Sequence, residues 1–112
     1  MSQEILNSIL RDVAKGVREL FQDRLESTIL FGSFARGDYD EESDIDIAVL
    51  ADCKREDVGK FLGLLAPLAT DIGLAYGKLV SFVCIPYADY MEWLPALPFY
   101  QNIEREGVKL SA

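Results

Sequence analysis

The sequence predicts a single α/β domain in which helices pack on a small mixed β-sheet. Three short segments rich in β-branched and aromatic residues alternate with two longer segments whose apolar residues recur every three to four positions. The chain has 112 residues, half of them hydrophobic and 27% charged, which is the composition of one globular domain. The expected order of elements across residues 1–112 is α-β-β-α-β-α.

The first expected helix covers residues 2–24, with Ser2 placed to cap its first turn. Its apolar positions share one face of the helix, and they are Ile5, Leu6, Ile9, Leu10, Val13, Val17, Leu20 and Phe21. The first expected strand follows at 27–31, where the β-rich run STILF ends at Gly32.

The later elements follow from the same two periodicities. They are a strand over 44–50, a helix over 55–75, a strand over 78–85, and short helices over 87–93 and 99–106. Pro67 lies inside the helix over 55–75, so that helix should kink there, or break and restart. Residues 108–110 form an end piece.

The composition excludes several classes of function. The chain has no histidine, and Cys53 and Cys84 are far apart, which excludes histidine-based catalysis and the usual zinc sites and favours two reduced thiols. The net charge of −8 argues against free nucleic-acid binding, which needs a basic face. No uninterrupted apolar run approaches ~20 residues, and the N-terminus does not resemble a secretion signal, so we expect no membrane segment and a cytoplasmic location.

Six carboxylates fall within residues 38–46, and the last two, Asp44 and Asp46, lie in a run of Ile, Ala, Val and Leu. Because side chains alternate along a strand, both would lie on one face, about 6.6 Å apart. Burying an unpaired carboxylate costs several kcal/mol, so a positively charged partner is expected. Two carboxylates in this arrangement can hold Mg²⁺; the alternative is an exposed sheet edge with solvated acids.

A turn that could bind phosphate precedes this strand. Gly32 allows the backbone to approach a ligand closely, Ser33 places a hydroxyl at the start of the turn, and Arg36 can direct two N–H groups at phosphate oxygens. A Gly-Ser turn is common in proteins, so this feature alone indicates little.

In combination the two features resemble the signature of the polymerase β-like nucleotidyltransferases, which is Gly-Ser, ten residues, then Asp-x-Asp. Gly32-Ser33 and Asp44-Ile45-Asp46 fit that spacing, and GSFARG is similar to the polymerase β form of the first half. PFYQNIEREGVKL is similar to the ending of small bacterial and archaeal members. The resemblance covers nearly the whole chain, which looks like a minimal nucleotidyltransferase (MNT), a type often encoded beside a helical HEPN-domain protein.

The resemblance implies a function and the residues that perform it. Gly32, Ser33 and Arg36 would bind the phosphates of a nucleoside triphosphate, and Asp44 and Asp46 would ligate the catalytic Mg²⁺. The chain would transfer a nucleoside monophosphate (NMP), namely AMP taken from ATP, to a hydroxyl group on a protein partner such as a HEPN toxin. In this way it would act as the antitoxin.

One carboxylate of the family pattern is missing. The next strand usually carries a third carboxylate, and the residue that aligns with it is Ser81, whose hydroxyl is a poor Mg²⁺ ligand and no base near neutral pH. Asp38, Asp71 or Asp89 could replace it from another element. The alternative function is therefore a binding-only antitoxin or regulatory subunit that acts by contact, and a third is a nucleotide sensor without transfer.

Two further features are open to two interpretations each. The acidic run 38–43 is either a solvated loop or a docking site for a basic partner. The aromatic residues gathered in 87–100 either pack the tail against the sheet or form a protein interface. A homodimer is also possible, without an interface that the sequence locates.

Overall fold

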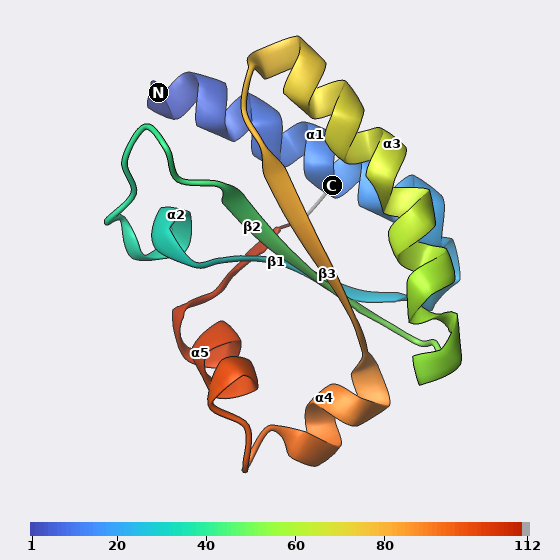
Figure 1. Ribbon diagram of the computed structural model, residues 1–112. Helices are drawn as coiled ribbons and strands as arrows, with labels where there is room; N and C mark the ends of the chain where they lie inside the picture. The colour runs from blue at the N-terminus through green and yellow to red at the C-terminus, as the bar shows by residue number, and fades with distance from the viewer. Residues whose placement is uncertain (111–112) are drawn as a thin grey trace.

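In the computed structural model, which describes residues 1–110, four strands form one mixed sheet with helices on both faces (Figure 1). The strand order is β3-β2-β1-β4. β1 (Leu25–Phe31) pairs antiparallel with β2 (Ile45–Ala51) and with β4 (Val108–Leu110), and β2 pairs parallel with β3 (Val80–Pro86). The predicted fold class is confirmed.

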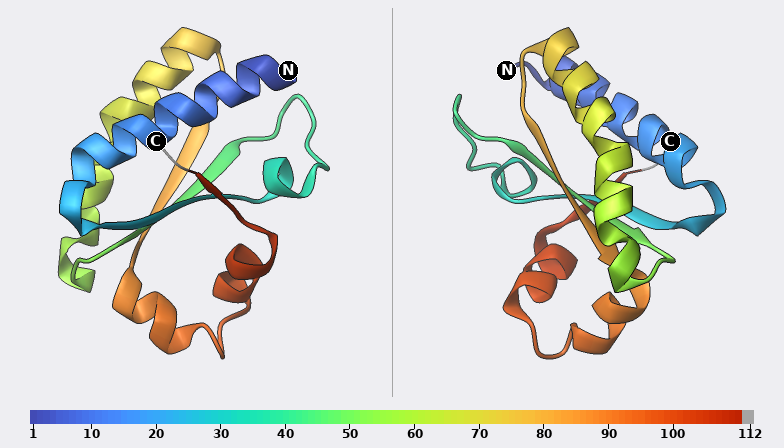
Figure 2. Two further views of the ribbon diagram at one scale, coloured as in Figure 1. Left: turned by 180° about the vertical axis from the view of Figure 1, so that it is seen from behind. Right: turned by 45° about the vertical axis from the view of Figure 1, so that its right-hand side comes forward.

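The helices form two layers. α1 (Gln3–Phe21) and α3 (Val58–Tyr76) lie side by side on one face of the sheet, and α4 (Tyr87–Trp93) and α5 (Pro98–Glu106) lie on the other (Figures 1 and 2). Because both faces are covered, the central strand β2 is buried along nearly its whole length, which explains its apolar sequence.

The side chains of β2 alternate between the two layers. Ile45, Ile47, Val49 and Ala51 belong to the larger core beneath α1 and α3, whereas Ala48 and Leu50 belong to the smaller core beside α4 and α5. Asp46 shares the face of Ala48 and Leu50 because it is two residues from Ala48. The candidate site therefore lies on the α5 side of the sheet.

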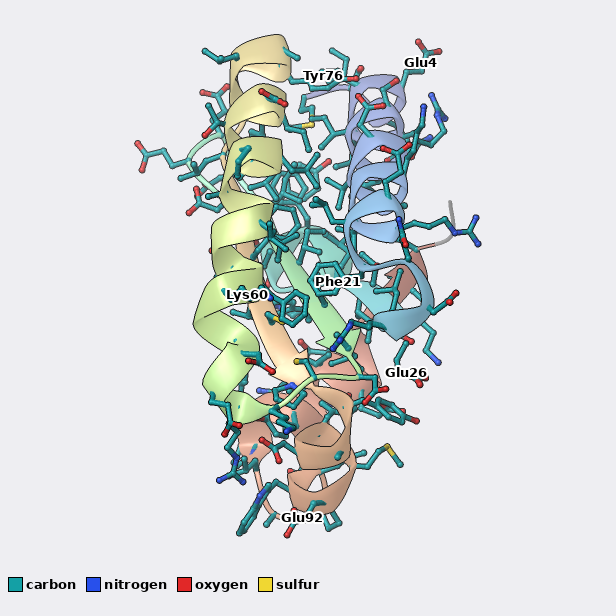
Figure 3. The ribbon with its side chains drawn as sticks, turned by 90° about the vertical axis from the view of Figure 1, so that its right-hand side faces the viewer. Glu4, Phe21, Glu26, Lys60, Tyr76 and Glu92 are labelled. Atoms are coloured by element: carbon teal, nitrogen blue, oxygen red, sulfur yellow. The ribbon has the colours of Figure 1, made fainter. Side chains whose placement is uncertain are left out.

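α1 is shorter at its C-terminal end than predicted. Ser2 caps its start, with Ser2 Oγ accepting the N–H of Ile5 at 3.1 Å, as expected from the sequence. The helix ends at Phe21 because Gln22 takes a positive φ of 50°, and Gln22–Arg24 form a single 3₁₀ turn, η1. Phe21 points into the space between the two long helices, where it stacks on Phe61 of α3 at 5.0 Å between ring centroids (Figure 3).

α3 runs unbroken past Pro67, so the helix does not restart there. A short 3₁₀ turn, η2 (Arg55–Asp57), precedes it. Pro67 is exposed, and so is Gly63, whose carbonyl loses its helical partner because proline has no N–H. Solvent can satisfy that carbonyl, which explains why the helix tolerates the proline.

By length and composition, Arg55–Tyr76 is also apolar enough to cross a membrane. No membrane segment was predicted from the sequence, because no uninterrupted apolar run is long enough. In the structure Phe61, Leu65 and Ile72 belong to the core beneath the helices, and one such helix is weak evidence for a membrane span.

Two elements were not predicted: the short helix α2 (Ser33–Arg36) and the edge strand β4, which the sequence presents only as an end piece. α4 has the predicted bounds, and the other predicted strands and helices agree within a few residues. Both cysteines are free thiols, and Cys84 is buried in β3, as expected.

Candidate active site

The Gly-Ser turn connects β1 to α2. Gly32 has φ 74° and ψ −155°, a combination that is almost exclusive to glycine. Its carbonyl accepts two backbone N–H groups of α2, both at 3.1 Å, which closes the first turn of that helix. α2 ends at Gly37, which has a left-handed conformation with φ 87°. The sequence GSFARG therefore forms one tight turn at the end of β1.

Asp46 lies directly against this turn. The antiparallel register pairs Asp46 with Phe31, so the carboxylate projects beside the point where β1 ends. A Cβ atom on Gly32 would overlap Asp46 Oδ2. The missing side chain at Gly32 thus makes room for the carboxylate, and the two halves of the motif are in contact.

Asp44 has a different environment from the one expected. β2 begins at Ile45, so Asp44 is the last residue of the preceding loop and is exposed, whereas Asp46 is half-buried. The prediction that both carboxylates lie inside a core strand is therefore wrong for Asp44. The physical reason is that β1 ends at Phe31, opposite Asp46, and leaves Asp44 without a strand partner on that side.

The electrostatics at Asp46 favour a cation. Burial raises the pKa of Asp46, the negative charge of Asp44 raises it further, and Arg36 lowers it by a smaller amount. The two carboxylates are therefore close enough to repel each other. A divalent cation between them would remove this repulsion, and carboxylate oxygens are ligands that Mg²⁺ prefers. The residues present thus fit a magnesium ion at Asp44 and Asp46.

Replacing Asp46 by Asn is expected to stabilise the metal-free protein at pH 7 by up to about 1 kcal/mol once solvent screening of the half-buried charge is allowed for, or roughly 5 °C in Tm. The raised pKa means that the native state holds the charged carboxylate less favourably than the unfolded chain does. Above both pKa values Asp46 is therefore destabilising, and as the pH falls through the raised native pKa the group protonates and the penalty disappears. Thermal unfolding of both proteins at pH 7 and pH 4 checks this. The expectation would be contradicted if the stability gained by Asp46→Asn over the wild type were larger at pH 4 than at pH 7.

Ser81 lies where the family's third carboxylate is expected. The parallel register of β2 and β3 pairs it with Asp46, and Ser81 is exposed on the same face. The three possible replacements have other partners or positions: Asp38 is paired with Arg36, Asp71 is on α3 across the sheet, and Asp89 on α4 is paired with Arg55 at 2.6 Å. Within residues 1–110 no three acidic or cysteine side chains are grouped so that they could hold a metal ion.

A pocket of about 350 Å³ lies at this turn. On one side it is lined by residues of the motif and its strand, namely Phe31, Gly32, Ser33, Arg36 and Asp46. On the other it is lined by three residues of α5, namely Phe99, Asn102 and Glu106. Four of the five predicted site residues are thus brought together, and Asp44 lies outside the lining, two positions before Asp46.

Arg36 is held at the edge of the pocket from two directions. Its Nε donates to Asp38 Oδ2 at 3.2 Å, and its Nη1 donates to Glu106 Oε2 at 3.4 Å. The hydrogen bond to Asp38 is the main cause that raises the pKa of Arg36. The guanidinium stays charged and faces the pocket, which suits the binding of an anion.

The three pocket residues contributed by α5 were not predicted from the sequence. Their spacing of i, i+3 and i+7 was visible, since it puts Phe99, Asn102 and Glu106 on one helix face. Nothing local indicated that this face turns toward Asp46, because that depends on how the tail folds back across the sheet.

The chain belongs to the nucleotidyltransferase domain family, whose sequence model matches residues 10–110. Two curated relatives from Methanocaldococcus jannaschii are described as candidate protein adenylyltransferases. One is 38% identical over 73 residues, which cover 65% of this chain and 72% of the relative. The other is 30% identical over 101 residues, which cover 88% and 90%.

Solved structures share the fold. A candidate minimal nucleotidyltransferase superimposes with a TM-score of 0.67 at 23% identity, covering 98% of this chain and 97% of that one. A chain from the complex of a tri-AMPylated HEPN toxin with its MNT antitoxin from Shewanella oneidensis gives a TM-score of 0.53 at 22% identity, covering 92% and 69%. The resemblance drawn from the sequence is therefore confirmed: the family is that of the nucleotidyltransferase domain, and the fold is shared with a candidate minimal nucleotidyltransferase.

Proposed function

We propose that this chain is a Mg²⁺-dependent adenylyltransferase that moves AMP from ATP to a hydroxyl group of a protein partner, a HEPN-type toxin, and acts as its antitoxin. The observation that supports this most is the contact between the Gly32-Ser33 turn and Asp46. Through it, the half of the motif suited to phosphate and the half suited to a metal ion meet at one pocket.

The motif residues have two different roles, phosphate binding and metal binding, which follow from the chemistry of their side chains. Ser33 and Arg36 bind the terminal phosphates of ATP, and Asp44 and Asp46 hold Mg²⁺, which when bound neutralises the triphosphate and lowers the pKa of the attacking hydroxyl. The acceptor oxygen attacks the α-phosphorus in line. A new O–P bond forms, the bond to the bridging oxygen breaks, pyrophosphate leaves, and the hydroxyl proton passes to solvent.

Three observations support a protein acceptor. The net charge of −8 disfavours a nucleic acid. The two archaeal relatives are described as candidate protein adenylyltransferases. A structure with the same fold contains a HEPN toxin that carries AMP. A cytoplasmic location and a homodimer stay predictions.

Ser81 favours a second candidate function, a binding-only antitoxin. A hydroxyl beside Asp46 replaces the carboxylate that would complete a second metal site, and no described residue takes its place. Such a protein would neutralise its partner by contact alone.

The test compares α-labelled with γ-labelled ATP in the presence of Mg²⁺. The purified protein is incubated with each label, alone, with the product of the neighbouring gene, and with cell lysate. Adenylyl transfer places the α-label, and not the γ-label, on a protein band that identifies the acceptor. The absence of α-label on any protein, with a stable complex between the two gene products, would contradict the enzyme and support the binding-only antitoxin.

A further inference from the structure

We propose that α5 forms the nucleoside-binding wall of the pocket, with Phe99 stacking on the base and Asn102 donating a hydrogen bond to its edge. The inference rests on the proposed function and adds to it the residues that recognise the nucleotide. The motif residues account for the phosphates and the metal ion, but none of them can recognise a base. The α5 side of the pocket carries side chains suited to that task.

The placement of these residues matches the shape of a nucleotide. Phe99, Asn102 and Glu106 occupy one face of α5, and all three line the same 350 Å³ pocket as the Gly-Ser turn. Glu106 contacts Arg36, so the C-terminal end of α5 lies at the phosphate end of the pocket. Phe99 is seven residues earlier, about 10 Å along the helix. A nucleotide extends by a similar length from its phosphates to its base.

Phe99 has the properties of a stacking platform. Its ring meets Phe31 of β1 edge to face, with centroids 5.7 Å apart and an interplanar angle of 82°, and this contact fixes the ring against the sheet. The side chain is nevertheless 46% exposed. A ring held in place by the scaffold but still accessible from the pocket can stack on a planar ligand at little entropic cost.

Asn102 is oriented by its own helix. Its Oδ1 accepts a hydrogen bond from Arg105 Nη2 at 2.8 Å. This contact occupies one of the two lone pairs of the amide oxygen and turns that oxygen toward Arg105, which leaves the NH₂ group available to donate to a ligand. An amide donor fits a ring nitrogen of a purine or a carbonyl oxygen of a pyrimidine. Asn102 therefore supplies the directional contact that stacking alone lacks.

The aromatic residues of the tail also separate into two groups. Tyr90 is buried, and its hydroxyl donates to Glu104 Oε2 at 2.7 Å, so it serves the small core between α4, α5 and the sheet. Trp93 and Phe99 are exposed to nearly the same extent, 44% and 46%, but only Phe99 lines the pocket. Trp93 therefore provides a matched control for the loss of an exposed aromatic side chain.

The experiment measures the affinity of the purified full chain for two ligands by isothermal titration calorimetry with Mg²⁺. One ligand is α,β-methylene ATP, which binds as a nucleotide and cannot transfer AMP; the other is inorganic tripolyphosphate, which lacks the nucleoside. Phe99→Ala and the more conservative Phe99→Leu are expected to weaken binding of α,β-methylene ATP roughly tenfold and to leave tripolyphosphate unchanged. Phe99→Trp should bind α,β-methylene ATP as tightly as the wild type does, and Trp93→Ala should change the affinity for neither ligand.

Asn102→Ala is expected to reduce discrimination among ATP, GTP, CTP and UTP several-fold, again without changing tripolyphosphate binding. Full affinity for α,β-methylene ATP in both Phe99→Ala and Phe99→Leu would overturn the inference, and so would an equal loss for both ligands. In either case a wild-type protein that binds both ligands leaves the proposed function standing. A wild-type protein that binds neither ligand would overturn the proposed function together with the inference.

Discussion

Replacing Asp44 and Asp46 together by Asn is expected to lower AMP transfer by about a thousandfold or more while the protein stays folded. Both carboxylates act through their negative charge, and an amide oxygen of similar shape is a much weaker Mg²⁺ ligand. Losing a metal ion that stabilises the developing charge costs several kcal/mol of activation free energy, and each 1.36 kcal/mol is a factor of ten in rate. The fold should not suffer, because the substitution removes a partly buried charge and its repulsion by Asp44, the two causes that raise the pKa of Asp46.

The measurement is the rate of α-label incorporation under single-turnover conditions, with the unfolding temperature measured in parallel. Asp71→Asn is the matched control, since it removes an exposed carboxylate from α3 on the opposite side of the sheet. Control and wild type should transfer at the same rate. Transfer by the double variant within tenfold of the wild type would show that these carboxylates do not hold the catalytic metal.

The Asp44→Asn/Asp46→Asn double variant also distinguishes an adenylyltransferase from a binding-only antitoxin. A binding-only antitoxin needs its contact surface and not its metal site, so the double variant should bind and neutralise the partner as well as the wild type does. An adenylyltransferase antitoxin should lose neutralisation in proportion to transfer. Growth rescue of cells that express the partner protein, compared with label incorporation in the same strains, distinguishes the two.

The parts of the fold that sequence reasoning predicted are those encoded by local patterns. Ser2 and the apolar stripe of α1 define that helix within one segment, and the apolar run of β2 indicates a core strand. The spacing of the Gly-Ser and Asp-x-Asp motif is likewise visible in the sequence as a local pattern. Gly32 and Asp46 come together because they lie at the facing ends of two adjacent antiparallel strands. Even the alignment of Ser81 beside Asp46 agrees with the observed register.

The parts that could not be predicted depend on contacts between distant segments. β4 has only three residues, and its pairing of Val108 with Leu30 comes from packing rather than from a strand pattern. The position of α5 at the pocket also depends on a contact between distant segments. The sequence shows Phe99 only as one of several aromatic residues in the tail, and its contact with Phe31 becomes evident only in the structure. The exposure of Asp44 was missed because it depends on the pairing register, which sets Asp46 and not Asp44 opposite Phe31, the last residue of β1.

Gly32→Ala is expected to destabilise the protein by about 1–3 kcal/mol and to lower AMP transfer by about a hundredfold. The backbone at Gly32, with φ 74° and ψ −155°, is strained for any residue with a side chain, and that strain alone accounts for the stability loss. The larger effect on activity has a separate cause. The new Cβ would overlap Asp46 Oδ2, so the carboxylate must move away from the position in which it faces Ser33 and Arg36. Displacement of a catalytic group by about 1 Å is enough to cost two orders of magnitude in rate.

Gly37→Ala is the control that separates backbone strain from displacement of Asp46. Gly37 also has a positive φ, 87°, but nothing lies within 4 Å of the position that its Cβ would take. This variant should lose about 1–2 kcal/mol in stability and keep its transfer rate. Urea unfolding and single-turnover labelling of both variants, at a temperature where each is fully folded, give the comparison. Equal transfer rates would mean that the Gly32 conformation serves only the turn; a deficit confined to Gly32→Ala would mean that the glycine is needed because the carboxylate occupies the space of its missing side chain.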